Sequence, residues 1–220
     1  MLRILAFSDL HANELAAVKL TRLSKDVDVL VGAGDFGNAR RDVQRTVDIL
    51  KTVNKPAVLI AGNNESTEEL RTACAGWESS LVLHGESVEI GTHPGSFLAT
   101  PPETGGGRVP GIPFFGLPGG VPVTPFGAWS YDFSEEQARS MLARCPTRAV
   151  LVSHSPPKGI LDRSSSGTSL GSVAVREAID SLRPRLVVCG HIHASVGRVV
   201  MESGVVVVNA GPGGVVVEIE

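Results

Sequence analysis

Short apolar runs that end in glycine or in polar residues recur along this chain, and they constrain its fold more than any other feature. They include RILAFSD, VDVLVGAGD, PAVLIAGN, AVLVSHS, LVVCGH and GVVVVNAG. Continuous runs of valine, isoleucine and leucine of this length are typical of strands covered on both faces. Helical patterns lie between the runs, so the alternation predicts right-handed crossovers and a largely parallel sheet. The closing stretch GRVVMESGVVVVNAGPGGVVVEIE is typical of strands joined by tight turns, which predicts a mixed sheet.

Capping signals predict where two of the intervening helices begin. Ser66 with Glu69 and Ser134 with Gln137 have the spacing of a capping box, in which each side chain satisfies a free backbone N–H group. A further helix is predicted from about Val173 to Leu182, where a nearby proline ends the pattern.

Length and composition place the chain among globular proteins. Its 220 residues predict a single domain over residues 1–220. A hydrophobic content of 42% with 20% charged residues argues against disorder, and a formal net charge of -3 gives no reason to expect general nucleic-acid or membrane binding. No apolar run reaches about 18 residues, and the first residues lack the features of a signal peptide. Three scattered cysteines without CxxC spacing predict reduced thiols, so we expect a cytoplasmic protein.

A segment rich in proline and glycine interrupts the strand and helix pattern. Residues from about 93 to 127 contain eight of the 14 prolines and a triple glycine, and only IPFFG in the middle is typical of a strand. Loops of this length are either functional lids or mobile surface segments. Both interpretations of this insertion stay open at this point.

Polar side chains follow the predicted strands at the point where each strand ends. They are Asp9 and His11, Asp35, Asn63 and Asn64, His154, and finally His191 and His193. In an open α/β sheet the ligand crevice lies outside the carboxyl ends of the strands, so these groups are predicted to converge there. In extended chain, residues i and i+2 project to the same face, which predicts that Asp-x-His and His-x-His each act as a bidentate unit.

The chemistry of this set favours metal ions. Two carboxylates, four imidazoles and at least one amide oxygen suit Mn²⁺, Fe, Zn²⁺, Ni²⁺ or Co²⁺ better than Ca²⁺ or an iron–sulfur cluster. Seven candidate ligands are too many for one tetrahedral ion. They suit two ions bridged by one carboxylate, roughly 3.5–4 Å apart. Each motif alone has a plain structural interpretation, such as a helix cap for Asp9 or a packed core histidine for His154.

The order of these motifs resembles that of the calcineurin-like metallophosphoesterases, whose pattern is D-x-H, G-D-x-x-[DN], G-N-H-[DE], a lone H and G-H-x-H. This chain has DLH, GDFGN, GNNE, His154 and GHIH in that order, and its NAGPGG resembles the closing turn of the family. The resemblance implies a four-layer αββα sandwich with two mixed sheets and a dinuclear metal site. It also implies that Asp9, His11 and His193 bind one ion, that Asn63, His154 and His191 bind the other, and that Asp35 bridges both.

One position departs from the family pattern. The resemblance implies a histidine where this chain has Asn64, and in the family that histidine contacts phosphate and protonates the leaving oxygen. Asparagine donates hydrogen bonds but gives up no proton near neutral pH. General-acid help of about 10²–10⁴-fold is therefore expected to be missing from this position. Glu65 occupies the acidic slot of the motif and is expected either to orient a ligand or to stabilise the start of the next helix.

These observations lead to one preferred hypothesis about function. The chain is a dinuclear-metal-dependent phosphoesterase, a phosphodiesterase first and a broad phosphatase second, with in-line attack by a metal-bridging hydroxide as the resemblance implies. Asp35 and Asn64 are the candidate catalytic residues, and Asn64, Asn38 and Arg40 are the candidate phosphate contacts. The expected cofactors are two divalent ions, with Mn²⁺ as the first choice. The expected substrate is a small-molecule or nucleotide phosphate ester.

The alternative hypothesis is a non-catalytic scaffold of the same fold that binds metals or a protein partner. Loss of the usual histidine and a long insertion region with Phe114, Phe115, Phe126 and Trp129 favour it, whereas the otherwise complete ligand set favours the enzyme. A homo-oligomer is compatible with either hypothesis.

Overall fold

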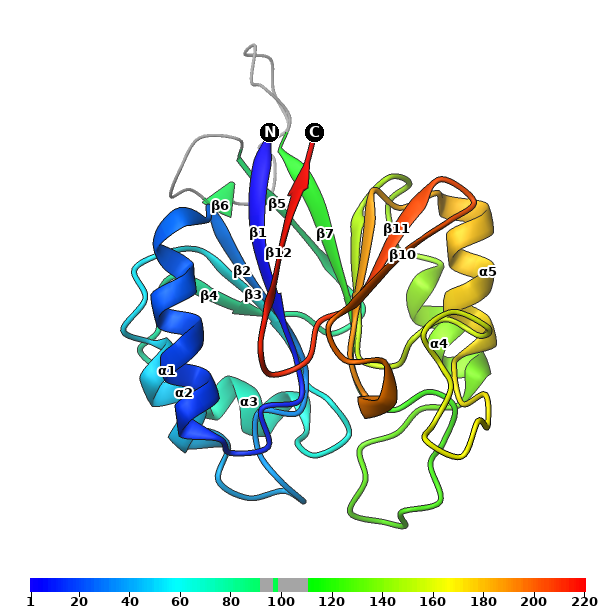
Figure 1. Cartoon of the computed structure of the whole chain (residues 1–220), viewed down its shortest axis with the longest axis horizontal. Coiled ribbons are helices and arrows are strands. Elements are labelled where there is room, and N and C mark those ends of the chain that lie inside the picture. Colours follow the sequence, from blue (N-terminus) through cyan, green and yellow to red (C-terminus); the bar gives the residue numbers. More distant parts are fainter. Residues whose placement is uncertain (92–96, 99–110) are drawn as a thin grey trace.

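The apolar runs form strands of two sheets that pack face to face (Figure 1). The structure is a computed structural model, and it describes residues 1–91, 97–98 and 111–220. The predicted insertion at about 93–127 lies partly outside the described residues. Its IPFFG stretch falls in a strand of the second sheet, as predicted.

Among the described residues, the first sheet has five strands in the order β12-β1-β2-β3-β4. Its strands are β1 (Leu2–Phe7), β2 (Val29–Ala33), β3 (Ala57–Ile60), β4 (Ser80–Val82) and β12 (Val215–Ile219). All neighbours are parallel except β12, which runs antiparallel to β1 with Leu2 opposite Ile219. The sheet is therefore mixed, and the last strand of the chain closes it beside the first.

The second sheet has seven strands within the described ranges, in the order β10-β11-β9-β8-β7-β5-β6. Its strands are β5 (Ser87–Ile90), β6 (Phe97–Leu98), β7 (Ile112–Leu117), β8 (Val150–Ser153), β9 (Leu186–Cys189), β10 (Arg198–Glu202) and β11 (Val205–Asn209). The central strands β7, β8, β9 and β11 are parallel, and antiparallel strands flank them on both sides. The prediction of a mixed sheet from the closing stretch is thus confirmed.

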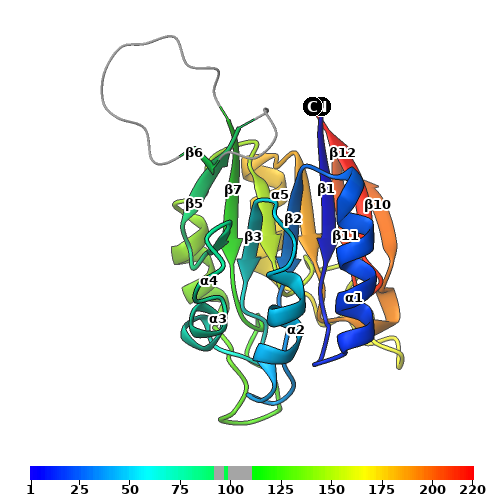
Figure 2. The same cartoon turned by 90° about the vertical axis from the view of Figure 1, so that its left-hand side faces the viewer.

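In the part of the chain that the structure describes, five α-helices cover the outer faces of the two sheets (Figure 2). They are α1 (Glu14–Leu23), α2 (Val43–Leu50), α3 (Thr67–Ala73), α4 (Glu135–Leu142) and α5 (Val173–Leu182). Both predicted capping boxes are present, at the start of α3 and at the start of α4. The bounds of α5 are those predicted from its apolar pattern.

The apolar core has three layers, which explains why the strands are apolar on both faces. One cluster lies between the sheets and includes Ile4, Ile60, Phe114 and Val188. A second joins the first sheet to α1, α2 and α3, and a third joins the second sheet to α4 and α5. The prediction of a four-layer αββα sandwich is confirmed. None of the helices in the described part of the chain is long and apolar enough to cross a membrane.

Candidate metal centre

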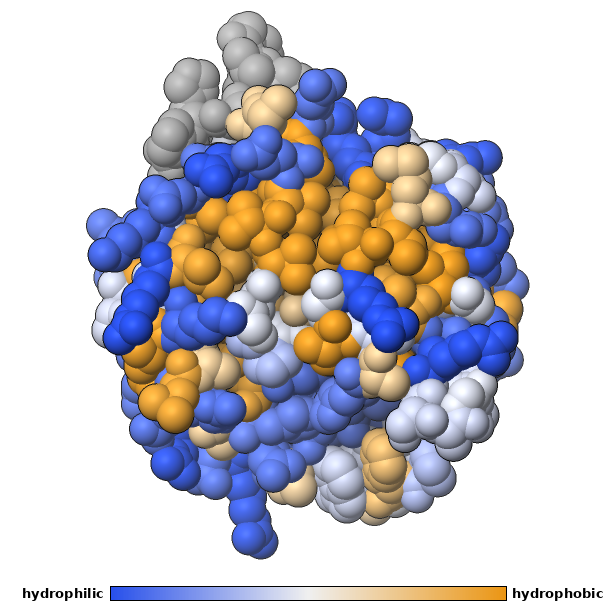
Figure 3. All heavy atoms as spheres, in the orientation of Figure 1, coloured by the Kyte–Doolittle hydropathy of each residue, from blue (hydrophilic) through white to orange (hydrophobic). Residues whose placement is uncertain are grey.

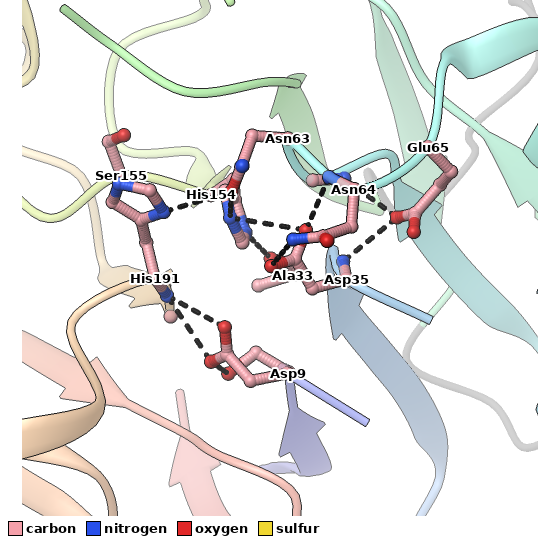
Figure 4. Close-up of polar contacts among 12 residues, drawn as sticks. Asp9, Ala33, Asp35, Asn63, Asn64, Glu65, His154, Ser155 and His191 are labelled. Carbon is pink, nitrogen blue, oxygen red and sulfur yellow. Dashed lines mark hydrogen bonds and ion pairs between the residues drawn. The ribbon is translucent and has the colours of Figure 1, made fainter. Parts of the chain in front are cut away.

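The predicted ligands lie in the loops that follow five strands. Asp9 and His11 follow β1, Asp35 follows β2, Asn63 follows β3, His154 follows β8, and His191 and His193 follow β9. The structure brings side chains from both sheets together at this edge, and Figure 4 shows several of these residues pointing toward one another. Convergence of the strand ends is therefore observed.

The local reason for this convergence differs from the one expected. Asp9, His11, Asp35 and His191 all have φ between 45° and 64°, in the left-handed region, and His193 begins a short 3₁₀ turn (His193–Ser195). The prediction that Asp9 and His11, and also His191 and His193, project from extended chain was wrong. The chain instead turns sharply as soon as each strand ends. Residues other than glycine adopt this conformation at a cost of about 1–3 kcal/mol each, and such residues cluster at functional sites.

Two glycines permit the strand-end loops to approach each other closely. A Cβ atom on Gly62 would lie 2.1 Å from Oδ1 of Asp35, and one on Gly190 would lie 2.5 Å from Oδ2 of Asp9. Any side chain at either position would displace a carboxylate from the site. No residue larger than glycine therefore fits at positions 62 and 190 without a shift of the site.

The first ligand group consists of Asp9, His11 and His193, whose ligand atoms all lie within 4.8 Å of one another. Nε2 of His11 lies 3.1 Å from Nε2 of His193, and Nε2 of His193 lies 3.6 Å from Oδ1 of Asp9. Two imidazole nitrogens and a carboxylate oxygen thus face one small volume. This donor set is suited to a divalent transition-metal ion.

The second ligand group consists of Asn63, His154 and His191. Oδ1 of Asn63 lies 3.2 Å from Nε2 of His154 and 3.1 Å from Nδ1 of His191. Nδ1 of His154 lies 2.8 Å from the carbonyl oxygen of Ala33, a contact that assigns the proton to Nδ1 and leaves the lone pair of Nε2 directed at the group. The Nδ2 group of Asn63 donates to Oγ of Ser130, so its oxygen is the atom left facing the histidines.

Asp35 lies between the two groups. Its Oδ2 is 3.7 Å from Nε2 of His11, and its Oδ1 is 3.5 Å from Nε2 of His154. Asp35 also forms a second cluster of close ligand atoms with Asp9 and His154. One carboxylate therefore presents a separate oxygen to each ligand group.

The surroundings suit a cation at both groups. Asp9 and Asp35 are 4% and 2% exposed, and in the described part of the chain their ion pairs are all with histidines. Burial opposes the charged form of Asp9, yet the interaction with His193 lowers the pKa of its carboxyl group to about 2. Burial lowers the pKa of His191 to about 3, so this imidazole is neutral and free to coordinate. Buried carboxylates and a neutral imidazole, with no lysine or arginine paired to the carboxylates among the described residues, fit bound divalent ions.

Asn64 and Glu65 hold Asp35 in place. The Nδ2 group of Asn64 donates to Oδ2 of Asp35 at 2.7 Å, and its backbone N–H donates to Oδ1 at 2.9 Å. Glu65 is fully buried and accepts the backbone N–H groups of Asp35, Gly62 and Gly37. Burial and the charge of Asp35 raise the pKa of the Glu65 carboxyl group to about 7. Glu65 therefore links the loop after β2 to the loop after β3. Its carboxyl group bonds to backbone N–H groups there and not to the ligand atoms.

The structure also places the other candidate residues and two that the sequence did not reveal. Arg40 bonds to Glu69 at 2.7 Å and Asn38 bridges backbone with Arg41, so neither side chain is among those lining the central cleft. Ser8 donates to Oδ2 of Asp9 at 2.6 Å, and Asn209 donates to the carbonyl oxygens of residues 190 and 192. Two sequence signals point to these positioning residues: Ser8 adjoins the first motif, and Asn209 begins NAGPGG, which resembles the closing turn of the family.

Comparisons with known proteins identify the family and the fold of the chain. The sequence model of the calcineurin-like phosphoesterases matches residues 2–195, whereas a comparison with curated proteins found no match. The fold is similar to the crystal structure of TT1561 from Thermus thermophilus, with 18% identity, a TM-score of 0.70, and coverage of 96% of this chain and 90% of that chain. It is also similar to that of phosphopantetheinyl hydrolase (PptH) from Mycobacterium tuberculosis, with 16% identity, a TM-score of 0.54, and coverage of 94% and 88%. The chain belongs to the calcineurin-like phosphoesterase family and is a metal-dependent phosphoesterase.

Proposed function

We propose that this chain is a dinuclear phosphoesterase that prefers diesters. In this proposal Asp9, His11 and His193 hold one divalent ion, Asn63, His154 and His191 hold the other, and Asp35 contacts both. The observation that carries the proposal is the position of Asp35, which directs one carboxylate oxygen to a histidine of each group at 3.7 Å and 3.5 Å. A single-ion site would leave one of the two groups without a function.

In the proposed mechanism the ions would supply the charge, and the residues of the chain would hold the ligands in position. Divalent ions, with Mn²⁺ as the first choice, would lower the pKa of a coordinated water and offset the negative charge of the phosphate group. The residues of the chain hold the ligands at fixed positions, since Ser8, Asn64 and Asn209 each bond a ligand or the loop that carries one. Such prior ordering avoids reorganisation during the reaction.

The preference for diesters follows from Asn64. Its side chain donates to Asp35 and accepts the backbone N–H of Ala39 at 2.8 Å, so both ends of the amide already have partners. An amide cannot release a proton to a leaving alkoxide near neutral pH. We therefore expect substrates whose leaving group departs without a proton from this position, and phosphate diesters of small molecules or nucleotides are the proposed class.

A matched pair of aryl substrates tests this preference. With Mn²⁺ present, kcat/KM for bis(p-nitrophenyl) phosphate is expected to exceed that for p-nitrophenyl phosphate by about tenfold or more. Both substrates release the same p-nitrophenolate, which departs without a proton, so the ratio compares a diester with a monoester at a constant leaving group. Protein treated with a chelator and dialysed is the control, and re-addition of Mn²⁺ restores activity. A clear preference for the monoester would contradict the diesterase proposal.

The scaffold alternative has less support than the sequence alone indicated. Phe114 and Phe115, two of the four aromatic side chains on which it rested, are completely buried in the core. Only Phe126 and Trp129 are exposed, at 52% and 39%. A chain that binds metal stoichiometrically but hydrolyses neither substrate would favour the scaffold hypothesis over the enzyme.

A further inference from the structure

Two exposed aromatic side chains form one wall of the cleft above the metal centre. The cleft has a volume of about 590 Å³, and its lining includes Asp35, Asn64 and His193 together with Phe126 and Trp129. The rings of Phe126 and Trp129 are nearly parallel, with an angle of 18° between their planes and 5.9 Å between their centroids. Exposed aromatic rings next to a polar site are typical of a surface that binds an organic group.

The loop that carries these rings is fixed directly to the metal centre. The backbone N–H of Tyr131 donates to the carbonyl oxygen of Asn63 at 3.0 Å, and the side-chain amide of Asn63 donates to Oγ of Ser130 at 3.1 Å. Arg40 donates to the carbonyl oxygen of Trp129 at 3.3 Å. A candidate metal ligand thus holds the neighbour of Trp129, so the distance from rings to metal centre is set by the folded chain.

The rest of the lining limits what occupies the cleft. Leu170, Ile192 and Ala194 add apolar surface, and Ser164 and Ser165 add neutral hydroxyl groups. None of the lining residues, all of which belong to the described part of the chain, is a lysine or arginine. A polyanion such as a nucleic acid would need such cations along its backbone.

We propose that Phe126 and Trp129 bind the organic group of the phosphate ester by stacking, so the substrate carries a flat aromatic group such as a nucleobase. This inference rests on the proposed function, because the phosphate end is assumed to lie at the metal centre. Stacking on aromatic side chains tolerates any flat ring, which predicts selectivity for aromatic over alkyl esters rather than for one base.

Two non-hydrolysable phosphonates test the inference by calorimetry on the Mn²⁺-loaded protein. Phenylphosphonate and methylphosphonate share the same anionic head, and the phenyl compound is expected to bind about 10–100-fold more tightly to the wild type. Trp129→Ala removes most of this difference, while Trp129→Phe retains it because a ring remains. Phe126→Ala is a second variant with the same expectation.

The outcomes separate this inference from the proposed function. Equal affinity of the two phosphonates for the wild type, or an alanine variant that weakens both equally, overturns the stacking inference. Hydrolysis of bis(p-nitrophenyl) phosphate by the wild type remains an independent readout, and its absence contradicts the proposed function instead. Near-UV circular dichroism of each variant checks that the fold is intact.

A different part of the molecule carries a second inference. Apolar side chains gather on the face formed by β12, β10 and β11 (Figure 3). Strand β10 is the outer strand of its sheet, and Val199, Val200 and Met201 are 50%, 37% and 71% exposed. Among the described residues, no strand pairs with its outer edge. Exposed, apolar edge strands are templates for pairing with another chain.

The sequence of β10 is complementary to itself. If two copies of RVVME pair antiparallel about Val200, Arg198 of each copy lies opposite Glu202 of the other, and Val199 lies opposite Met201. Arg198 forms no ion pair with another described residue, so its charge is available. Glu202 already bonds to Arg176 at 2.9 Å and can accept a second partner.

The directions of the backbone N–H and C=O groups in β10 are compatible with this antiparallel pairing. Ser203 and Gly204 both have positive φ, which is the signature of a two-residue hairpin turn closed by the pair Glu202 and Val205. In that pattern Glu202 and Val200 direct their backbone groups toward β11, and the alternation leaves those of Val199 and Met201 directed outward. These are the residues that would exchange hydrogen bonds in the symmetric pairing.

We infer that two copies of this chain associate through β10 to form a continuous sheet. Light scattering after gel filtration is expected to give twice the 23.0 kDa of one chain. Arg198→Glu and Glu202→Arg are each expected to raise the dimer dissociation constant by about tenfold or more, because like charges then face each other twice. The double variant restores the wild-type dimer. A monomeric wild type, or single variants that stay dimeric, overturns the inference.

Discussion

Replacing Asp35 by asparagine is expected to lower kcat/KM for a diester by about 10³-fold or more, because metal ions contribute several kcal/mol of charge stabilisation. Asp35 faces His11 and His154 with different oxygens, and Oδ2 also accepts the amide of Asn64 at 2.7 Å. Asparagine at position 35 supplies one side-chain oxygen at most. Its amide N–H group would also face an N–H donor of Asn64. Loss of either ion explains the loss of rate.

Steady-state kinetics with bis(p-nitrophenyl) phosphate at saturating Mn²⁺ measure this effect. Asp48→Asn is the matched control, since Asp48 is an exposed carboxylate on α2 that bonds Gln44 and Lys51. That variant is expected to stay within about twofold of the wild type, as is usual for surface substitutions. Activity of Asp35→Asn close to that of the control would argue against a role for Asp35 at both ions.

Replacing Glu65 by alanine is expected to destabilise the fold by about 3 kcal/mol or more, since three buried backbone donors lose their acceptor at about 1–3 kcal/mol each. The donors are the N–H groups of Asp35 and Gly62, both at 2.8 Å, and of Gly37 at 3.1 Å. Glu65→Gln is expected to cost less, because one oxygen still serves Asp35 and Gly62. Its amide group would then face the N–H of Gly37.

Urea denaturation measures both changes in the free energy of unfolding. Glu68→Ala is the control, because this neighbouring carboxylate is 81% exposed and pairs only with Arg71 among the described residues; a change within about 0.5 kcal/mol is expected. A Glu65→Ala variant as stable as the control would show that water replaces the carboxylate without cost. A glutamine variant less stable than the alanine variant would show that the donor clash outweighs the retained bonds.

The fold could be predicted from the sequence largely because both faces of the central strands are buried. Runs such as RILAF in β1 and LVVC in β9 lie between the apolar layers, so their composition carried a strong signal. The starts of helices could also be predicted where a capping box is present, as at Ser66 and Ser134. The pairing of β12 with β1 joins residues from the two ends of the chain, and no local pattern specifies it.

The candidate site was predictable as a set of residues but not as a geometry. Strand-end positions predicted the convergence of Asp9, Asp35 and His154, whereas the left-handed turns at Asp9 and Asp35 follow from contacts between loops distant in sequence. Phe126 and Trp129 lie in a segment without periodicity, so nothing in the sequence placed them over the centre. Their position depends on the bonds between Asn63 and the chain at 130–131.

In the proposed site, side chains from the two sheets hold a pair of divalent ions around the shared carboxylate of Asp35. Calorimetric titration of the metal-free protein with Mn²⁺ counts these ions. Two ions per chain are expected for the wild type, and one or none for Asp35→Asn. A wild-type stoichiometry of one or zero, or two ions retained by Asp35→Asn, would contradict the proposed site.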